Sequence, residues 1–208
     1  SDTPLYGKWE ENNNYYTITF DTRGGSPVEP ITEQFVNTVK LPQNGVTKGG
    51  CEFKWWETDY DEKVSFDFTV PAHNITLHAV WLCTHINTAE EFISFSKVVN
   101  SGISFSGTTV FLDADLDFSG GLSEQFEPFG NTDSMYFQGT FNGQGHIISN
   151  LAISSSSSEY TGLFGYSDGA TIRNVVLDSS CSVVGSFSGI NSVYVGGVIG
   201  YCYAYNGP

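Results

Sequence analysis

The chain repeats itself at a fixed spacing. The segment GTFNGQGHIISNLAI, residues 139–153, is echoed by GLFGYSDGATIRNVVL, residues 162–177, and a third copy, YVGGVIGY, begins at Tyr194. A shorter echo links LYGKW, residues 5–9, with LHAVW, residues 77–81. Such self-similarity is typical of stacked architectures, in which each unit buries its apolar face only against a neighbour. Surfaces, stalks and binding modules are built in this way more often than enzymes.

The charge balance narrows the classes of partner. The sequence holds 23 acidic and 8 basic residues, a formal net charge of −15. Nucleic-acid binding requires clustered Lys and Arg, so we do not expect a nucleic-acid partner, and an anionic membrane would repel the chain. No apolar run reaches the roughly 18 residues that span a bilayer. We therefore expect extracellular protein or glycan partners, together with neighbouring repeats of the same chain.

Four separated landmarks lie in the first half. They are TITFDTRGGS at residues 17–26, VKLP at 39–42, Gly-x-x-Phe-x-x-Trp at 50–56, and Ile-Thr-Leu-x-Ala-x-Trp at 75–81. Together they resemble the Listeria–Bacteroides repeat, a small β-grasp-like module found in tandem on secreted and cell-surface proteins, including the internalin B-repeat. The resemblance implies such a module over residues 12–82, preceded at residues 1–11 by the end of another repeat.

The second half begins with a helix signal. Thr88-Ala-Glu-Glu91 is a capping-box pattern ahead of an apolar-periodic run, so we expect a helix at about 88–100. The short strand-like segments that follow resemble the GLUG-type β-solenoid modules of secreted adhesins, on the motifs at residues 110–117, 128–130, 137–151 and 162–165. The resemblance implies that residues 83–208 form a helix-capped right-handed parallel β-helix, truncated at its C-terminus. The expected fold class is therefore mostly β.

The cysteines fall two in each half, at Cys51, Cys83, Cys181 and Cys202, without Cys-x-x-Cys spacing. We favour two disulfides over free thiols, which indicates an oxidising, extracellular compartment. The first repeat family usually carries an aromatic where Cys51 stands, and Cys83 lies just beyond the family pattern. This joint departure suggests a Cys51–Cys83 bridge. Cys181 and Cys202 are expected on consecutive coils, where strands stack closely enough for a second bridge.

Three features are candidate ligand sites. Asp113, Asp115 and Asp117 have the spacing of a calcium loop, but Phe118 stands where that loop requires Gly, so we favour a solvated acidic strand face. Trp55 is expected to point outward, because its neighbour Trp56 matches a core position of the family. Its ring either packs on a neighbouring element or forms a stacking platform for a sugar or a protein. Asn74 begins an Asn-Ile-Thr glycosylation sequon.

The functional expectation is non-catalytic. The sequence contains neither a His-Glu-x-x-His nor a Gly-x-Ser-x-Gly motif, and it indicates no cofactor. Repeat-equivalent residues should stack and fill the interior, and the expected pairs are Phe141 with Phe164, Ile148 with Ile172, Asn150 with Asn174, and Ile153 with Leu177. We expect part of a surface or secreted repeat protein for adhesion, display or host interaction, including virulence. The alternatives are an accessory region of a secreted hydrolase or protease, and a carbohydrate-binding module.

Overall fold

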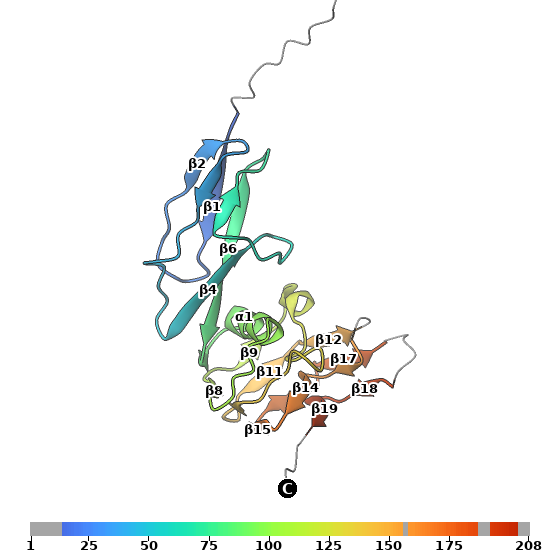
Figure 1. Cartoon of the computed structure of the whole chain (residues 1–208). Coiled ribbons are helices and arrows are strands. Elements are labelled where there is room, and N and C mark those ends of the chain that lie inside the picture. Colours follow the sequence, from blue (N-terminus) through green and yellow to red (C-terminus); the bar gives the residue numbers. More distant parts are fainter. Residues whose placement is uncertain (1–13, 156–157, 187–191, 204–208) are drawn as a thin grey trace, which may run out of the picture. The chain divides into compact units, whose positions relative to one another are not determined.

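The computed structural model describes residues 14–155, 158–186 and 192–203 (Figure 1). The described chain forms two compact units. The first unit consists of residues 14–46 and 55–79, and the second of residues 47–54 and 80–203. Strands dominate both, as expected, and the single α-helix of the described residues belongs to the second unit. Within the described residues, no helix is both long and apolar enough to cross a membrane.

The main sheet of the first unit has four strands in the order β2-β1-β6-β4. Their bounds are β1 (Tyr15–Asp21), β2 (Ile31–Gln34), β4 (Cys51–Glu57) and β6 (Ile75–Cys83). β1 pairs antiparallel with β2 and parallel with β6. A separate antiparallel pair joins β3 (Thr38–Lys40) to β5 (Asp67–Thr69). The boundary between the units falls within β4 and β6, so both strands contribute to each unit.

Apolar alternation explains which face of the first sheet is buried. Ile18 on β1 and Leu77 on β6 are fully buried. Phe20 lies against Trp56, with ring centroids 4.8 Å apart. The Trp56 indole N–H donates to the Pro42 carbonyl oxygen at 2.8 Å, which satisfies the polar atom of this large buried ring. Trp56 is therefore the central core residue of the unit.

The second unit begins its repeating part with the helix α1 (Ala89–Asn100). The Thr88 hydroxyl oxygen accepts from the Glu91 N–H at 3.2 Å, and a Glu91 carboxylate oxygen accepts from the Asn87 N–H at 2.8 Å. These two bonds satisfy orphan donors at the helix start, as a capping box does. The predicted helix and its N-cap are confirmed.

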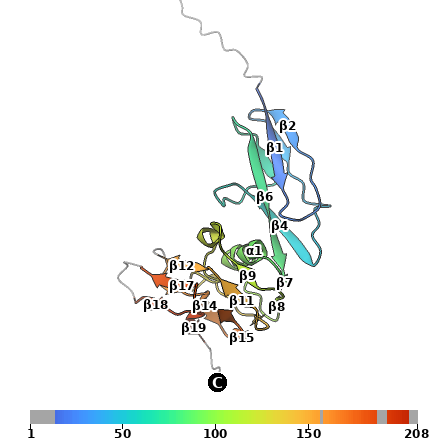
Figure 2. The ribbon, with the colours of Figure 1, turned by 180° about the vertical axis from the view of Figure 1, so that it is seen from behind.

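Parallel ladders make up the rest of the second unit (Figure 2). Their strands are β7 (His85–Ile86), β8 (Thr109–Leu112), β9 (Leu116–Asp117), β10 (Thr140–Asn142), β11 (Ile147–Ser149), β12 (Ala152–Ser155), β13 (Tyr160–Thr161), β14 (Phe164–Asp168), β15 (Thr171–Arg173), β16 (Val176–Leu177), β17 (Ser182–Gly185), β18 (Tyr194–Val195) and β19 (Ile199–Tyr203), with a 3-10 helix η1 (Leu122–Gln125). The five strands β10 to β14 pair, in order and all in parallel, with the five strands β15 to β19.

The register sets the length of one repeat. Thr109, Thr140 and Thr171 face one another on β8, β10 and β15, and equivalent positions on the first two of these strands are 31 residues apart. We call each such repeat a coil. Phenylalanines fill the interior, since Phe129 lies 4.8 Å from both Phe92 and Phe95 of α1 and 4.9 Å from Phe164 of β14, between ring centroids. The helix therefore covers this core with its phenylalanines, as predicted.

The predicted residue pairing between coils is wrong. Phe141 faces Ile172 rather than Phe164, and Ile148 faces Leu177 rather than Ile172. In the same way, Ile153 faces Val183 rather than Leu177. The predicted pairs are separated by less than one coil, because similar corner motifs recur within a coil as well as between coils. Asn150 and Asn174 illustrate the cause, since both have left-handed backbones (φ 56° and 54°) but occupy different corners.

One of the two predicted disulfides is present in the structure and the other is not. Cys51 and Cys83 are bonded, with their Cα atoms 4.3 Å apart on strands β4 and β6, which are neighbours in the sheet. The predicted Cys181–Cys202 bridge is wrong, because both thiols are free. Cys181 immediately precedes β17, whereas Cys202 lies on β19 and faces Ser167. The two residues are closer in sequence than one coil, so they belong to different ladders and do not stack.

Candidate functional site

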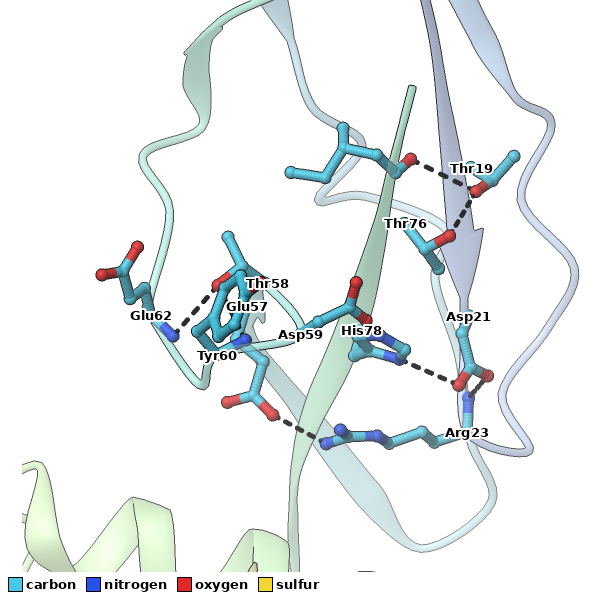
Figure 3. Close-up of polar contacts among 11 residues, drawn as sticks. Thr19, Asp21, Arg23, Glu57, Thr58, Asp59, Tyr60, Glu62, Thr76 and His78 are labelled. Carbon is cyan, nitrogen blue, oxygen red and sulfur yellow. Dashed lines mark hydrogen bonds and ion pairs between the residues drawn. The ribbon is translucent and has the colours of Figure 1, made fainter. Parts of the chain in front are cut away.

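A polar cluster lies on the first unit where β1 ends beside β6 (Figure 3). The parallel register pairs Asp21 with His78. The His78 Nδ1 atom is 3.0 Å from an Asp21 carboxylate oxygen, and its Nε2 atom is 2.7 Å from an Asp59 carboxylate oxygen. The ring therefore contacts one carboxylate from the end of β1 and one from the turn that follows β4.

The Asp21 carboxylate is held by several donors. Partial burial favours its neutral form, but the Arg23 backbone N–H, at 2.9 Å, and the His78 ring favour the charged form. With the nearby Arg23 guanidinium, these contacts outweigh burial and hold the pKa of Asp21 below its ordinary value. The Arg23 backbone is left-handed, with φ 46°, which turns the chain sharply after β1. Asp21 thus joins the strand end to its turn.

A buried ion pair completes the cluster. The Arg23 guanidinium donates to a Glu57 carboxylate oxygen at 2.9 Å, and the Glu57 side chain is 1% exposed. A buried carboxylate is costly unless a cation compensates it, so this pair fixes the turn after β1 against β4. The contacts run between ionisable groups of the same unit. The cluster therefore joins the end of β1, the turn after β4 and β6 within the first unit.

The predicted aspartate strand has a structural role in the second unit. His85 and Gln144 contact Asp113, and His146 contacts Asp115 at 3.0 Å. The Ile147 N–H and then His146 hold the pKa of Asp115 below its ordinary value. These donors lie about one coil away from the carboxylates that they bind, so the aspartates join successive coils.

Asp117 follows the same pattern. Its carboxylate accepts from the Asn150 amide at 2.8 Å and from the Ser119 N–H at 2.9 Å. The Asn150 and Ser119 donors hold the pKa of Asp117 below its ordinary value. Among the described residues, Asp113, Asp115 and Asp117 do not converge closely enough to share a cation, so the structure does not build the calcium loop that their spacing suggested.

Two other predicted sites fare differently. Trp55 is 6% exposed and carries the Lys63 ammonium 4.6 Å from its ring centroid, so its ring is packed against its neighbours rather than forming an exposed stacking platform. Adjacent strand residues can both be buried where each face of a strand is covered. Asn74 is exposed, and its side-chain oxygen accepts from the Thr17 N–H at 2.9 Å. Its glycosylation stays a prediction.

One group of potential metal ligands converges in the described second unit. It consists of Cys51, Cys83 and Glu91. The two sulfurs form the disulfide, and Glu91 pairs with the Lys48 ammonium at 2.8 Å. The bonded sulfurs carry no thiolate, the form that binds metals. The disulfide therefore joins β4 to β6, and the Lys48–Glu91 ion pair joins the segment before β4 to the first turn of α1.

A shallow cavity of about 320 Å³ lies beside η1. It is lined by Gly121, Ser123, Glu124, Phe126, Ala152 and Ser154. The Ala152 N–H donates to the Ser123 hydroxyl oxygen at 2.6 Å. Glu124 is the single carboxylate of this lining, so the cavity lacks the carboxylate pair of a glycoside hydrolase.

One known protein family matches the N-terminal part of the chain. Residues 16–80 match the Listeria-Bacteroides repeat domain. This agrees with the resemblance carried by the four sequence landmarks. The match lies within one part of the chain, and the GLUG-type resemblance of the second half stays a prediction. No solved structure matches the chain.

Relatives align over the same short length. A "Putative membrane protein" of Evansella cellulosilytica is 39% identical over 79 residues, which are 37% of this chain and 11% of that protein. A "Putative Gly-rich membrane protein" of the same organism is 33% identical over 82 residues, 38% of this chain and 9% of that protein. Halomucin of Haloquadratum walsbyi is 38% identical over 82 residues, 36% of this chain and 1% of that protein. The chain thus spans about a tenth or less of these relatives.

Sequence reasoning missed the Asp21–His78–Asp59 cluster. Asp21 and His78 lie on strands that were predicted, but their proximity depends on the parallel register of β1 and β6. Asp59 lies in the turn that follows β4, and nothing local in the sequence assigns it to His78. The sequence does place an acidic residue, Asp21, and a histidine, His78, in these two strands. Their pairing could be inferred only once the register of β1 and β6 was known.

Proposed function

We propose that this chain is a non-catalytic part of a surface-associated repeat protein that acts in display or adhesion. In this proposal residues 12–82 are a β-grasp-like Listeria–Bacteroides repeat, preceded by the end of another repeat at 1–11. Residues 83–208 are a helix-capped right-handed β-solenoid. The names of the relatives, which refer to membrane proteins and to a mucin, support a surface-associated location.

The observation that carries the proposal is the one-to-one pairing of β10 to β14 with β15 to β19. Such a repeat extends a surface by adding coils, and its interior is packed with side chains. Phe129, Phe141 and Phe164 are fully buried in that interior. A packed interior leaves binding to the outer surface, which suits a large extracellular protein or glycan.

The disulfide and the charge support an extracellular setting. A Cys51–Cys83 bond persists in oxidising compartments. A net charge of −15 favours solubility at a surface exposed to solvent. Host interaction and virulence would follow only if the source is a pathogen of a host.

The test compares binding with turnover on the whole purified chain. We expect saturable binding to extracellular-matrix proteins or to an array of polysaccharides, without hydrolysis of either class. Peptide bonds and glycosidic bonds are followed by mass spectrometry over long incubation. Hydrolysis that persists after repurification and disappears in the Glu124→Gln variant would contradict a non-catalytic role, because Glu124 lines the shallow cavity.

A further inference from the structure

Five tyrosines of the second unit gather into one surface, which we call the tyrosine patch: Tyr136, Tyr160, Tyr166, Tyr194 and Tyr201. The parallel register places Tyr160 opposite Tyr194 and Tyr166 opposite Tyr201 on successive coils. Ring centroids in these two pairs are 5.7 Å and 5.2 Å apart. The patch is therefore built by the repeat itself.

Contacts also run along each coil. The rings of Tyr160 and Tyr166 are 5.0 Å apart on one coil, and those of Tyr194 and Tyr201 are 4.8 Å apart on the next. Tyr136 joins the edge of this square at 6.1 Å from Tyr166. Packing of this kind restricts the rings, so a partner would meet a preorganised aromatic surface at little cost in side-chain entropy.

The patch is accessible. Tyr194 is 38% exposed, and Tyr160, Tyr166 and Tyr201 are half-buried. Among the described residues, no Lys or Arg lies over these rings, in contrast to Trp55 with its Lys63. The hydroxyls of the four paired tyrosines have no protein hydrogen-bond partner within the described chain. Both the rings and the hydroxyls are thus open to a ligand.

Carboxylates surround the tyrosines. Burial raises the pKa of Tyr160, and the charges of Glu159 and Asp133 raise it further. Burial likewise raises the pKa of Tyr166, to which Asp168 and Asp133 also contribute. Beyond Lys97 the sequence contains one basic residue, Arg173. The patch therefore lies in a negative field that its own unit leaves largely uncompensated.

We propose that the tyrosine patch binds a Lys- or Arg-rich segment of a partner protein. A guanidinium or ammonium group is attracted to the face of an aromatic ring and to a nearby carboxylate at the same time. Tyrosine and arginine are also the side chains that dominate binding energy at protein interfaces. A neutral sugar offers hydroxyl groups to the carboxylates but no charge for them to attract, and an anionic glycan is repelled by them. The proposal rests on the proposed surface role and deepens it by naming the partner's chemistry.

The experiment measures binding of a fluorescently labelled arginine-rich peptide to the whole chain by anisotropy. A peptide of equal length with glutamine in place of arginine is the probe control. We expect Tyr194→Ser to weaken binding by about two- to fivefold, the loss of one exposed cation–π contact. Tyr194→Phe keeps the ring and should bind like the unchanged chain. Tyr60→Ser removes a tyrosine of the first unit that is 87% exposed and should have no effect.

The outcomes separate the explanations. Equal binding by Tyr194→Ser and the unchanged chain would overturn the proposal, and binding that is also unchanged in Asp133→Asn would show unspecific attraction to a chain of net charge −15. Binding of a neutral oligosaccharide that is lost in Tyr194→Ser, without peptide binding, would identify a glycan surface instead. If the chain binds matrix proteins and the patch variants leave that binding unchanged, the patch proposal fails while the surface function stands.

Discussion

In the first unit, a salt bridge is buried beside the strands, whereas in the second unit the corresponding interior contains stacked phenylalanines. The ion pair between Arg23 and Glu57 occurs once, and no second buried ion pair of this kind is found in the described first unit. In the second unit, Phe129, Phe141 and Phe164 belong to one cluster to which successive coils contribute. The comparison teaches that a unique contact specifies a single turn, while a repeated contact specifies an architecture that can be extended.

The largest expected effect comes from the interior of the second unit. Phe129→Ala should cost about 3–5 kcal/mol, because it removes a fully buried ring and leaves a cavity among Phe92, Phe95 and Phe164. Hydrogen exchange followed by mass spectrometry measures the loss of protection unit by unit. Val184→Ala, at a position 56% exposed, is the control. Retained protection in the second unit would contradict a shared aromatic core.

The matching change in the first unit is Arg23→Ala. It should cost about 3 kcal/mol, because it leaves the buried Glu57 charge without its cation. Chemical denaturation with hydrogen exchange as the readout reports the loss in residues 14–46 and 55–79.

The control for Arg23 is an ion pair of similar length at the surface. Lys40 lies 2.8 Å from Asp67, but the two side chains are 87% and 65% exposed. Lys40→Ala should therefore cost far less than Arg23→Ala. Equal costs for Arg23→Ala and Lys40→Ala would show that burial does not distinguish the two pairs.

A third change tests the stacking of coils by backbone contact. A Cβ at Gly165 would lie 2.6 Å from the Gly130 carbonyl oxygen, whereas a Cβ at Gly197 would meet no atom within 4 Å. Gly165→Ala should destabilise the second unit by about 1–3 kcal/mol, because backbone must shift to admit the methyl group. Gly197→Ala is the matched control. The midpoints of thermal unfolding of the two variants are compared. Similar midpoints would show that the backbones of neighbouring coils can move apart at Gly165 without loss of stability.

Local signals in the sequence predicted the elements of the second unit better than their register. The Thr88–Glu91 capping box was sufficient for α1, because capping depends on residues close in sequence. The coil length depends on pairings such as Thr109 with Thr140, which no local pattern reveals. The corner asparagines Asn150 and Asn174 are locally alike, and they led to the wrong pairing of coils.

The first unit shows the same limit for its candidate site. The Cys51–Cys83 bridge was predicted because two departures from a family pattern coincided. The sequence left two readings of Trp55 open, a packed ring and an exposed platform, because the Lys63 that lies over the ring is on a segment whose path the sequence does not encode locally. In the second unit, the pair Tyr166 and Tyr201 was visible as a recurring Gly-Tyr motif, at Gly165-Tyr166 and Gly200-Tyr201, whereas Tyr160 and Tyr194 share no such motif. Recognising them required the correct coil length.

The smallest expected effect is on pH dependence, and it compares one aspartate from each unit. The pKa of Asp21 is lower in the folded chain than its ordinary value of 3.8. The unfolded chain therefore binds a proton on Asp21 at higher pH than the folded chain does. The resulting stabilisation is fully present above the ordinary pKa and is lost as pH falls through the folded pKa. Asp117 behaves in the same way in the second unit, where Asn150 and Ser119 lower its pKa.

Replacing each of these two carboxylates by an amide should change the acid dependence of stability in its own unit alone. Asp21→Asn should flatten the acid dependence of stability in residues 14–46 and 55–79, and Asp117→Asn should flatten it in residues 80–203, because each amide keeps some hydrogen bonds but cannot titrate. Hydrogen exchange measured from about pH 3 to about pH 7, corrected for the intrinsic exchange rate, gives both profiles from one sample. If either variant flattened both profiles equally, the units would unfold as one cooperative body, and their different chemistry would not divide their stability.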